Sequence, residues 1–198
     1  MARQQVAPLK LAFFVEGDAD KAFVEALVPR IVGREAVVRV LRVGDKAAFS
    51  STFYEAAQLL ESGYASAFFI VDADTAIAPE VETQRQRLVE VFRRYGLEDR
   101  VRICMAVPML ESWLLAAHQA EPERSTDPKR DLARLAGADS IRALAERLPI
   151  EQARRRSKSF DEFAAALQAF APRRARRARS AAAQVRRARG AAQVRRAS

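Results

Sequence analysis

The sequence predicts an α/β fold of the Rossmann-like type, with a mostly parallel four-stranded sheet and helices on both faces. The first observation is an alternation of short apolar runs with helical patterns along the first two thirds of the chain. The second is that these runs are continuously apolar, which is typical of parallel strands buried on both faces. The third is a 49% share of hydrophobic residues in 198, enough for a substantial core.

Each expected strand is a short apolar or β-branched run that stops at a turn signal. The four strands are expected over residues 10–15, 36–43, 67–71 and 101–107. The first ends at Glu16-Gly17, and the third ends in Asp72-Ala73-Asp74. Two of the predicted strands therefore have acidic residues at their carboxyl ends.

Four helices follow the strands, with expected bounds of 19–32, 46–61, 80–95 and 110–118. In the first, Phe23, Leu27 and Ile31 recur every four residues and so fall on one face. Asp18 follows a turn glycine and is expected to be the N-cap of this helix. Trp113, in the last of these helices, is expected in the core, and Cys104 as a buried thiol in the fourth strand.

The composition changes after residue 120, where a polar, proline-containing loop begins. Two short helices are expected beyond it, over 131–148 and 158–170, packed on the sheet. The predicted organisation is an α/β domain over 8–120, a helical extension over 121–171 and a low-complexity tail over 172–198. The tail repeats one seven-residue pattern and sustains no apolar stripe, so we expect it to be disordered.

The net charge of +9 comes from the tail. Residues 173–198 hold ten arginines and no acid, which leaves 24 basic against 25 acidic residues in the rest of the chain. Such a tail binds nucleic acid without sequence preference and with a steep dependence on salt. The candidate nucleic-acid-binding residues are Arg173, Arg174, Arg176, Arg177, Arg179, Arg186 and Arg187. The alternative is a low-complexity segment without function.

Several classes of protein are excluded by composition. One cysteine and one histidine exclude a disulfide framework and a Cys/His zinc site within this chain. No apolar run approaches the roughly 20 residues of a membrane-spanning helix, and the first ten residues are too polar for a signal peptide. We therefore expect a soluble, cytoplasmic protein.

The candidate functional residues are the carboxylates at the strand ends. Glu16 follows the first strand, Asp72 and Asp74 follow the third, and Asp20 and Glu111 lie a few residues beyond strand ends. Ligands of open parallel sheets bind at the carboxyl ends of the strands. Carboxylates converging there repel one another unless a cation is present, and oxygen-only ligands suit Mg²⁺ or Mn²⁺.

Some of these acids have an ordinary explanation. Asp18 is explained as the N-cap of the following helix, and Asp20 as an acid that complements the helix dipole. Asp74 is explained as a turn residue. Glu16 and Asp72 are harder to explain, since an acid at the end of an apolar strand costs free energy unless it is paired or bound. Their matching positions favour a metal site.

Three segments in order carry a resemblance to a known family. They are Phe14-Val15-Glu16-Gly17 with Asp20, then Ile70-Val71-Asp72-Ala73-Asp74, and finally Pro108-Met-Leu-Glu111-Ser-Trp113-Leu-Leu. Residues 10–118 resemble the TOPRIM domain of topoisomerases, primases and OLD-type nucleases. The nearest resemblance is to small bacterial TOPRIM-like proteins grouped as DUF4276, to which RloB-like proteins are similar.

The resemblance implies a TOPRIM fold and divalent-metal chemistry on phosphodiesters. It implies that Glu16 is a general acid/base or metal ligand, that Asp72 and Asp74 are metal ligands, and that Asp20 and Glu111 are further acids of the site. The chain departs from the family pattern at Ala19, where Thr or Ser is usual, and lacks a further acid near residues 117–118.

The expected function is that of a Mg²⁺-dependent nuclease or phosphoesterase acting on DNA or RNA. Roles in phage defence or nucleic-acid maintenance, together with a partner ATPase encoded alongside, fit the resemblance. The alternative is a non-catalytic nucleic-acid-binding or regulatory module, in which the acids only cap helices and the tail supplies the binding.

Overall fold

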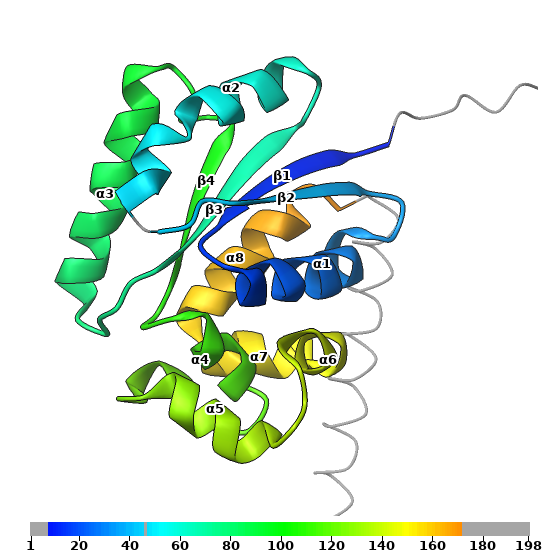
Figure 1. The fold of residues 1–198 in the computed structure, drawn as a ribbon, viewed down its shortest axis with the longest axis vertical. Coiled ribbons are helices and arrows are strands. Elements are labelled where there is room, and N and C mark those ends of the chain that lie inside the picture. The colour runs from blue at the N-terminus through cyan, green and yellow to red at the C-terminus, as the bar shows by residue number, and fades with distance from the viewer. Residues whose placement is uncertain (1–7, 46, 172–198) are drawn as a thin grey trace, which may run out of the picture.

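A computed structural model describes residues 8–45 and 47–171 and confirms the predicted α/β architecture (Figure 1). Its sheet has four strands, all parallel, in the order β2-β1-β3-β4. The strands are β1 (Lys10–Val15), β2 (Val37–Arg42), β3 (Ser66–Asp72) and β4 (Val101–Ala106). They lie within two residues of the bounds expected from the apolar runs.

The two central strands, β1 and β3, are joined by aromatic pairs. Phe13 is in register with Phe68, and Phe14 with Phe69. The two pairs stack with ring centroids 5.0 Å and 4.4 Å apart. Because successive side chains of a strand point to opposite faces, one pair lies in the core on each side of the sheet.

Helices cover both faces of the sheet (Figure 1). One face carries α1 (Asp18–Val32), and the other carries α2 (Phe53–Glu61) and α3 (Ala78–Arg94). The connection from β1 to β2 therefore crosses one face, and the connection from β2 to β3 crosses the other. This reversal makes the carboxyl ends of β1 and β3 a topological switch point, the place where open α/β sheets bind ligands.

The single helix expected over 46–61 is wrong. A 3₁₀ turn, η1 (Ala47–Ser51), precedes α2, which begins only at Phe53. The Ser51 hydroxyl donates to the carbonyl of Ala48 (2.7 Å), and the Thr52 hydroxyl donates to the carbonyl of Phe49 (2.9 Å). These local bonds favour a turn over a continuous helix.

Beyond β4, the regular structure of the described residues, up to residue 171, is entirely helical. It contains α4 (Leu110–Leu115), η2 (Pro122–Arg124), α5 (Pro128–Ala136), α6 (Ile141–Arg147), α7 (Ile150–Arg156) and α8 (Lys158–Gln168). The helix expected over 131–148 is two helices, because Gly137 at φ 58° ends α5 and the Ser140 hydroxyl caps α6. Helix α7 was not predicted.

The C-terminal helices share a core with α1 and one face of the sheet. Trp113 of α4 is fully buried and stacks on Phe163 of α8 with ring centroids 4.9 Å apart, which confirms the core prediction for Trp113. Cys104 is also buried as predicted, and burial raises the pKa of its thiol to about 12.

Among the described residues, none of the helices is both long and apolar enough to span a membrane. The Arg-rich tail, to which the candidate nucleic-acid-binding arginines belong, lies outside the described residues. The predictions for it stay predictions.

Candidate acidic site at the sheet switch point

Glu16 and Asp72 meet at the switch point. Glu16 directly follows β1, and Asp72 is the last residue of the neighbouring strand β3. The backbone amide of Asp72 donates to Oε1 of Glu16 at 3.4 Å. The structure therefore brings together the two acids that are hardest to explain as turn or capping residues.

The Asp72 carboxylate also links β3 to α4. Its Oδ1 accepts a hydrogen bond from the backbone amide of Leu110, the first residue of α4, at 2.9 Å. Burial and, to a smaller extent, the nearby carboxylates of Asp20, Glu111 and Glu16 together raise the pKa of Asp72 to about 8, against the opposing effect of the Leu110 hydrogen bond. Asp72 thus lies at the centre of a repulsive group of acids.

Asp20 lies in the first turn of α1, where its carboxylate binds the backbone at the start of the helix. Gly17 occupies the N-cap position, and its amide donates to Oδ2 of Asp20 at 2.9 Å. The expectation that Asp18 caps the helix is wrong: Asp18 is exposed and pairs with Arg42 at 2.6 Å. Burial raises the pKa of Asp20, with hydrogen bonding and Lys129 acting in the opposite direction.

Glu111 lies in the first turn of α4, beside the residue that binds Asp72. Burial raises the pKa of Glu111, and the charge of Asp20 adds to this effect, while Lys129 lowers it. Four predicted site residues from three parts of the chain therefore share one electrostatic environment: Glu16, Asp20, Asp72 and Glu111.

Asp74 is placed differently from the other predicted acids. It is exposed, and its backbone has a φ of 57°, a left-handed conformation that Asp tolerates better than most residues. Its amide donates to the carbonyl of Pro108 at 2.8 Å, and the amide of Ala73 donates to that of Ala106 at 2.9 Å. The backbone after β3 is thereby held against the end of β4.

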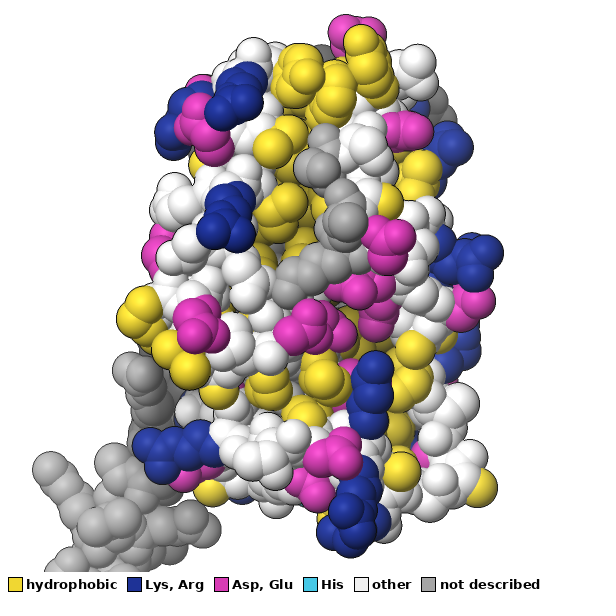
Figure 2. All heavy atoms as spheres, turned by 60° about the vertical axis from the view of Figure 1, so that its left-hand side comes forward, with side chains coloured by type: hydrophobic (Ala, Val, Ile, Leu, Met, Phe, Trp, Pro, Cys, Tyr) yellow, Lys and Arg dark blue, Asp and Glu magenta, His cyan; other side chains and the backbone are white. Residues whose placement is uncertain are grey.

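Acidic side chains gather in the middle of the face on which the strands end, which also carries several Lys and Arg side chains (Figure 2). Figure 2 shows Asp and Glu side chains gathered across the middle of this face, with hydrophobic side chains above and below them. The donor set contains oxygen ligands without cysteine or histidine, which suits a hard divalent cation. In residues 8–45 and 47–171, however, no three such side chains stand in an arrangement that holds a metal ion. The carboxylate oxygens fit Mg²⁺ chemically, but the acidic side chains are too far apart as they stand to surround one ion.

Two residues near the site carry no signal in the sequence. Gln84 of α3 donates from Nε2 to the carbonyl of Ala73, between the two aspartates, at 3.0 Å. Lys129 of α5 influences both Asp20 and Glu111. They lie 10 residues after Asp74 and 18 residues after Glu111, respectively, so only the packing of α3 and α5 reveals them.

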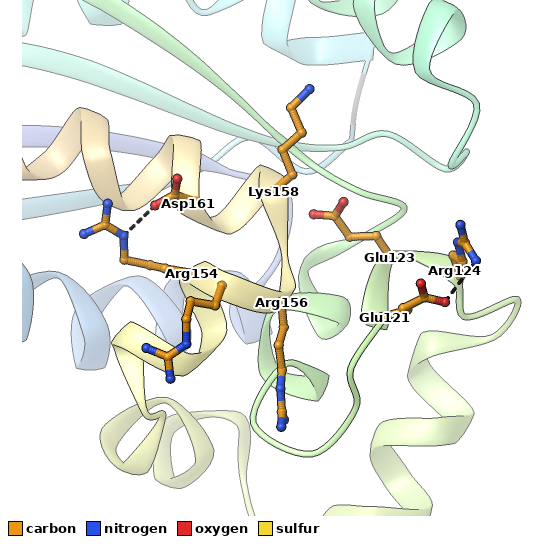
Figure 3. A pocket seen from close by; sticks show the side chains of 8 residues that line it. Glu121, Glu123, Arg124, Arg154, Arg156, Lys158 and Asp161 are labelled. Carbon is orange, nitrogen blue, oxygen red and sulfur yellow. Dashed lines mark hydrogen bonds and ion pairs between the residues drawn. The ribbon is translucent and has the colours of Figure 1, made fainter. Parts of the chain in front are cut away.

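A pocket of about 430 Å³ lies beside α7 and α8 (Figure 3). It is lined by Glu121, Glu123, Arg124, Arg154, Arg155, Arg156, Lys158 and Asp161. Figure 3 shows that Lys158 and Arg156 point in opposite directions. Arg154 pairs with Asp161 at 2.5 Å and Arg124 with Glu121 at 3.0 Å. Because these cationic side chains diverge or are already paired with acids, they do not converge on a single position where an anionic ligand would bind.

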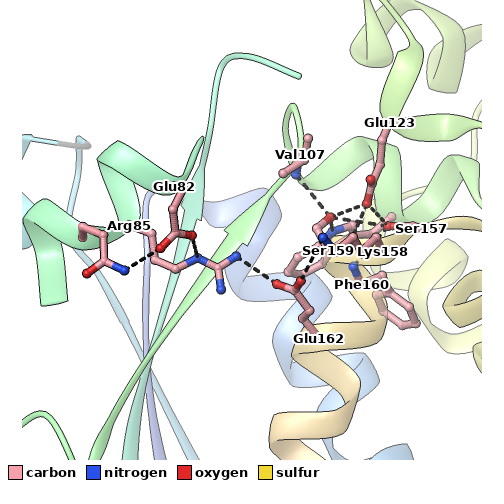
Figure 4. A network of polar contacts seen from close by, with 11 residues as sticks. Glu82, Arg85, Val107, Glu123, Ser157, Lys158, Ser159, Phe160 and Glu162 are labelled. Atoms are coloured by element: carbon pink, nitrogen blue, oxygen red, sulfur yellow. Dashed lines mark hydrogen bonds and ion pairs between the residues drawn. The ribbon is translucent and has the colours of Figure 1, made fainter. Parts of the chain in front are cut away.

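A polar network fastens the C-terminal helices to the sheet (Figure 4). Oε1 of Glu123 accepts hydrogen bonds from the hydroxyls of Ser157 and Ser159, each at 2.7 Å. The Ser159 hydroxyl in turn accepts from Nε1 of Trp113 at 2.8 Å. This network fixes α4, and therefore Glu111, relative to α8.

No family model, curated protein or solved structure matches this chain. The TOPRIM resemblance therefore stays a prediction, and the functional argument depends on the geometry of the acidic site.

Proposed function

We propose that this protein is a Mg²⁺- or Mn²⁺-dependent nuclease or phosphoesterase of TOPRIM type, which hydrolyses phosphodiesters of DNA or RNA. The observation that carries the proposal is the meeting of Glu16 and Asp72 at the switch point, where burial, together with the charges of Asp20, Glu111 and Glu16, raises the pKa of Asp72 to about 8. Strongly perturbed acids in a ligand-binding position are typical of functional sites.

The cost of assembling the acids supports a cation. Four carboxylates that repel one another and are partly buried destabilise the folded chain unless a ligand compensates them. A divalent ion bound there would supply positive charge to polarise a phosphodiester and stabilise the leaving oxygen. Asp72 and Asp20 would hold the ion, with Asp74 and Glu111 as further oxygen ligands.

Glu16 is the acid best placed to move a proton. It is half-buried and lies beside Asp72 at the end of β1. The charged groups that shift the pKa of Asp72 are all carboxylates, so a carboxylate has to serve as the proton-transfer group. In hydrolysis it would accept a proton from the attacking water or give one to the leaving oxygen. Because the acids do not form a closed cage in the described residues, the proposal requires their side chains to rotate when the ion binds.

The wider role proposed here depends on the resemblance alone. It places the activity in phage defence or nucleic-acid maintenance, with a partner ATPase encoded alongside. The Arg-rich tail would contribute attraction to nucleic acid, and the carboxylates would contribute the chemistry.

The test is cleavage of DNA and RNA by the purified protein with Mg²⁺, Mn²⁺ or EDTA. We expect metal-dependent cleavage that falls at least about 100-fold in Asp72→Asn and Glu16→Gln. Asp18→Asn is the matched control, because Asp18 lies next to the site but is exposed and paired with Arg42. Full activity in both site variants would refute the proposal.

The second candidate is a non-catalytic nucleic-acid-binding or regulatory module. It is favoured by the hydrogen bond from the Gly17 amide to Asp20, which gives this acid a purely structural role, and by the open arrangement of the carboxylates. On this alternative no metal supports cleavage, and removal of residues 172–198 abolishes nucleic-acid binding without unfolding the chain.

A further inference from the structure

Gln84 is a polar residue on the inner face of α3, where its neighbours are apolar. Val81 and Leu88, three residues before it and four after it, belong to the hydrophobic core between α3 and the sheet. Nε2 of Gln84 donates a hydrogen bond to the carbonyl oxygen of Ala73 at 3.0 Å. Ala73 stands between the two aspartates at the end of β3, so a side chain of α3 directly contacts the turn that carries two acids of the proposed site.

The carbonyl that Gln84 binds belongs to the peptide unit that joins Ala73 to Asp74. The N–H of the same peptide unit, on Asp74, donates to the carbonyl of Pro108 at 2.8 Å. One peptide unit is therefore held at its oxygen by α3 and at its nitrogen by the chain after β4. Because the peptide unit is planar, its orientation is set by ψ of Ala73 and φ of Asp74, and these two bonds restrain both angles.

The restrained angle at Asp74 is an unfavourable one. Its φ of 57° lies in the left-handed region, which residues other than glycine seldom adopt. Such a conformation persists only where the surrounding structure holds it. The bond from Gln84 opposes rotation of the peptide unit toward negative φ, and such a rotation would displace Asp74 relative to Asp72.

The other end of the Gln84 amide argues against a purely structural role. Its Oε1 is buried and accepts no hydrogen bond in the part of the chain that the structure describes. A buried acceptor without a partner costs free energy, and an apolar side chain of the same length, such as methionine, would avoid that cost. The gain from the bond to Ala73 is thus offset by the cost at Oε1, and the effect that remains is the fixed orientation of the turn.

We propose that Gln84 is a positioning residue of the acidic site. By fixing the peptide unit between Ala73 and Asp74, it holds Asp74 where its carboxylate serves as an oxygen ligand of the divalent ion. The inference rests on the proposed function for the identity of that ion. Residues that orient metal ligands in this way change the affinity for the metal without contacting it.

The first measurement is hydrogen exchange of the Asp74 amide by NMR, with the full chain and without metal. We expect exchange at least about tenfold faster in Gln84→Met than in the wild type, because the peptide unit loses the bond at its oxygen. Gln86→Met is the matched control, since the Gln86 amide binds Glu82 on the exposed side of the same helix. Unchanged exchange in Gln84→Met, or an equal increase in Gln86→Met, would overturn the inference.

The second measurement is the affinity for Mg²⁺ by calorimetry, in a double-mutant cycle with Asp74→Asn. Asparagine tolerates the left-handed conformation but removes the carboxylate. We expect Gln84→Met alone to weaken Mg²⁺ binding at least about fivefold, and to weaken it by less than about twofold when Asp74→Asn is also present. Equal losses in the two backgrounds would show that Gln84 does not act through Asp74, which contradicts the inference.

The two proposals fail in different ways. A wild type that binds Mg²⁺ but cleaves no phosphodiester refutes the nuclease, and the cycle still decides on Gln84. Metal-dependent cleavage together with unchanged Asp74 exchange in Gln84→Met refutes only the inference on Gln84, whereas a wild type that binds neither Mg²⁺ nor Mn²⁺ refutes both. When the wild type is active, Gln84→Met is expected to need at least about fivefold more Mg²⁺ for half-maximal cleavage and to approach the wild-type rate at saturating Mg²⁺.

Discussion

The backbone amide of Asp72 donates to the carboxylate of Glu16 at 3.4 Å, so the last residue of β3 contacts the first residue after β1. The two residues belong to neighbouring strands whose following connections cross opposite faces of the sheet. Helices leave the sheet on both sides of this point, so the carboxylates stand at an opening between them.

The raised pKa of Asp72 makes the stability of the protein dependent on pH. An acid whose pKa rises from its ordinary value to about 8 on folding binds its proton more tightly in the folded state. Stability is therefore greatest at low pH for this group, and it falls as the pH rises between about 4 and 8. In Asp72→Asn this decline disappears, because the amide does not ionise while its oxygen still accepts from Leu110.

We expect Asp72→Asn to be more stable than the wild type by about 2 kcal/mol at pH 8.5, with a smaller difference at pH 5. Urea unfolding at the two pH values measures this. Asp18→Asn serves as the control and is expected to change stability by less than about 0.5 kcal/mol, because Asp18 is exposed. A wild-type stability that increases from pH 5 to pH 8.5 relative to Asp72→Asn would contradict the prediction.

Divalent cations are expected to stabilise the folded chain through the same acids. A ligand that binds only the folded state at 100 times its Kd adds about 2.7 kcal/mol to the free energy of unfolding. The melting temperature of the wild type should rise with Mg²⁺ until the site is saturated. The same titration on Asp72→Asn should give little or no rise, and an equal rise in both proteins would show that the ion binds elsewhere.

The Glu123 network is expected to contribute to stability through satisfied hydrogen bonds. Ser159→Ala removes a hydroxyl that donates to Glu123 and accepts from Trp113, which leaves the buried indole N–H without this acceptor. The expected loss is about 1–3 kcal/mol in urea unfolding. Lys158→Ala changes the adjacent residue, whose side chain is 86% exposed, and should have little effect. Equal effects of the two changes would argue against the network.

Cys104 offers a direct test of burial in the sheet. It is the only cysteine, and burial raises the pKa of its thiol to about 12. Because the thiolate is the reactive form, the native protein should react with a thiol reagent at pH 8 far more slowly than the unfolded chain. The reaction rates of the native and the unfolded protein are expected to differ by more than about 100-fold. The rates are measured by the absorbance of the released product, with the reagent at a concentration equal to that of the protein. Rapid reaction without denaturant would show that this strand opens readily.

The fold was predictable because β1 and β3 are buried on both faces and therefore appear as continuous apolar runs, while the partly exposed β2 is recognisable by its β-branched residues. Glu16 and Asp72 were predictable for a related reason: an acid at the end of such a run has an evident energetic cost. The helix breaks near Thr52 and Gly137 were missed, since local hydroxyl bonds and a left-handed glycine leave the apolar periodicity intact.

Other features depended on exact positions or on distant packing. The assignment of the N-cap to Asp18 is an error of one residue in where the helix begins, since Gly17 occupies the N-cap and Asp20, at the third helical position, accepts from the Gly17 amide. Helix α7 is only seven residues long, and so short a segment shows little periodicity. The proximity of Lys129 to the acids arises from the packing of α5 on α4, which nothing in the surrounding sequence encodes locally.

The stacked pairs Phe13–Phe68 and Phe14–Phe69 have a consequence for the acidic site. A slip of β1 against β3 by one residue would turn each phenylalanine to the wrong face, and a slip by two would separate Glu16 from Asp72 by a further ~7 Å. The alignment of two carboxylates at the rim is thus determined by aromatic rings inside the two cores. Substitutions that shrink these rings would misalign the acids without touching them.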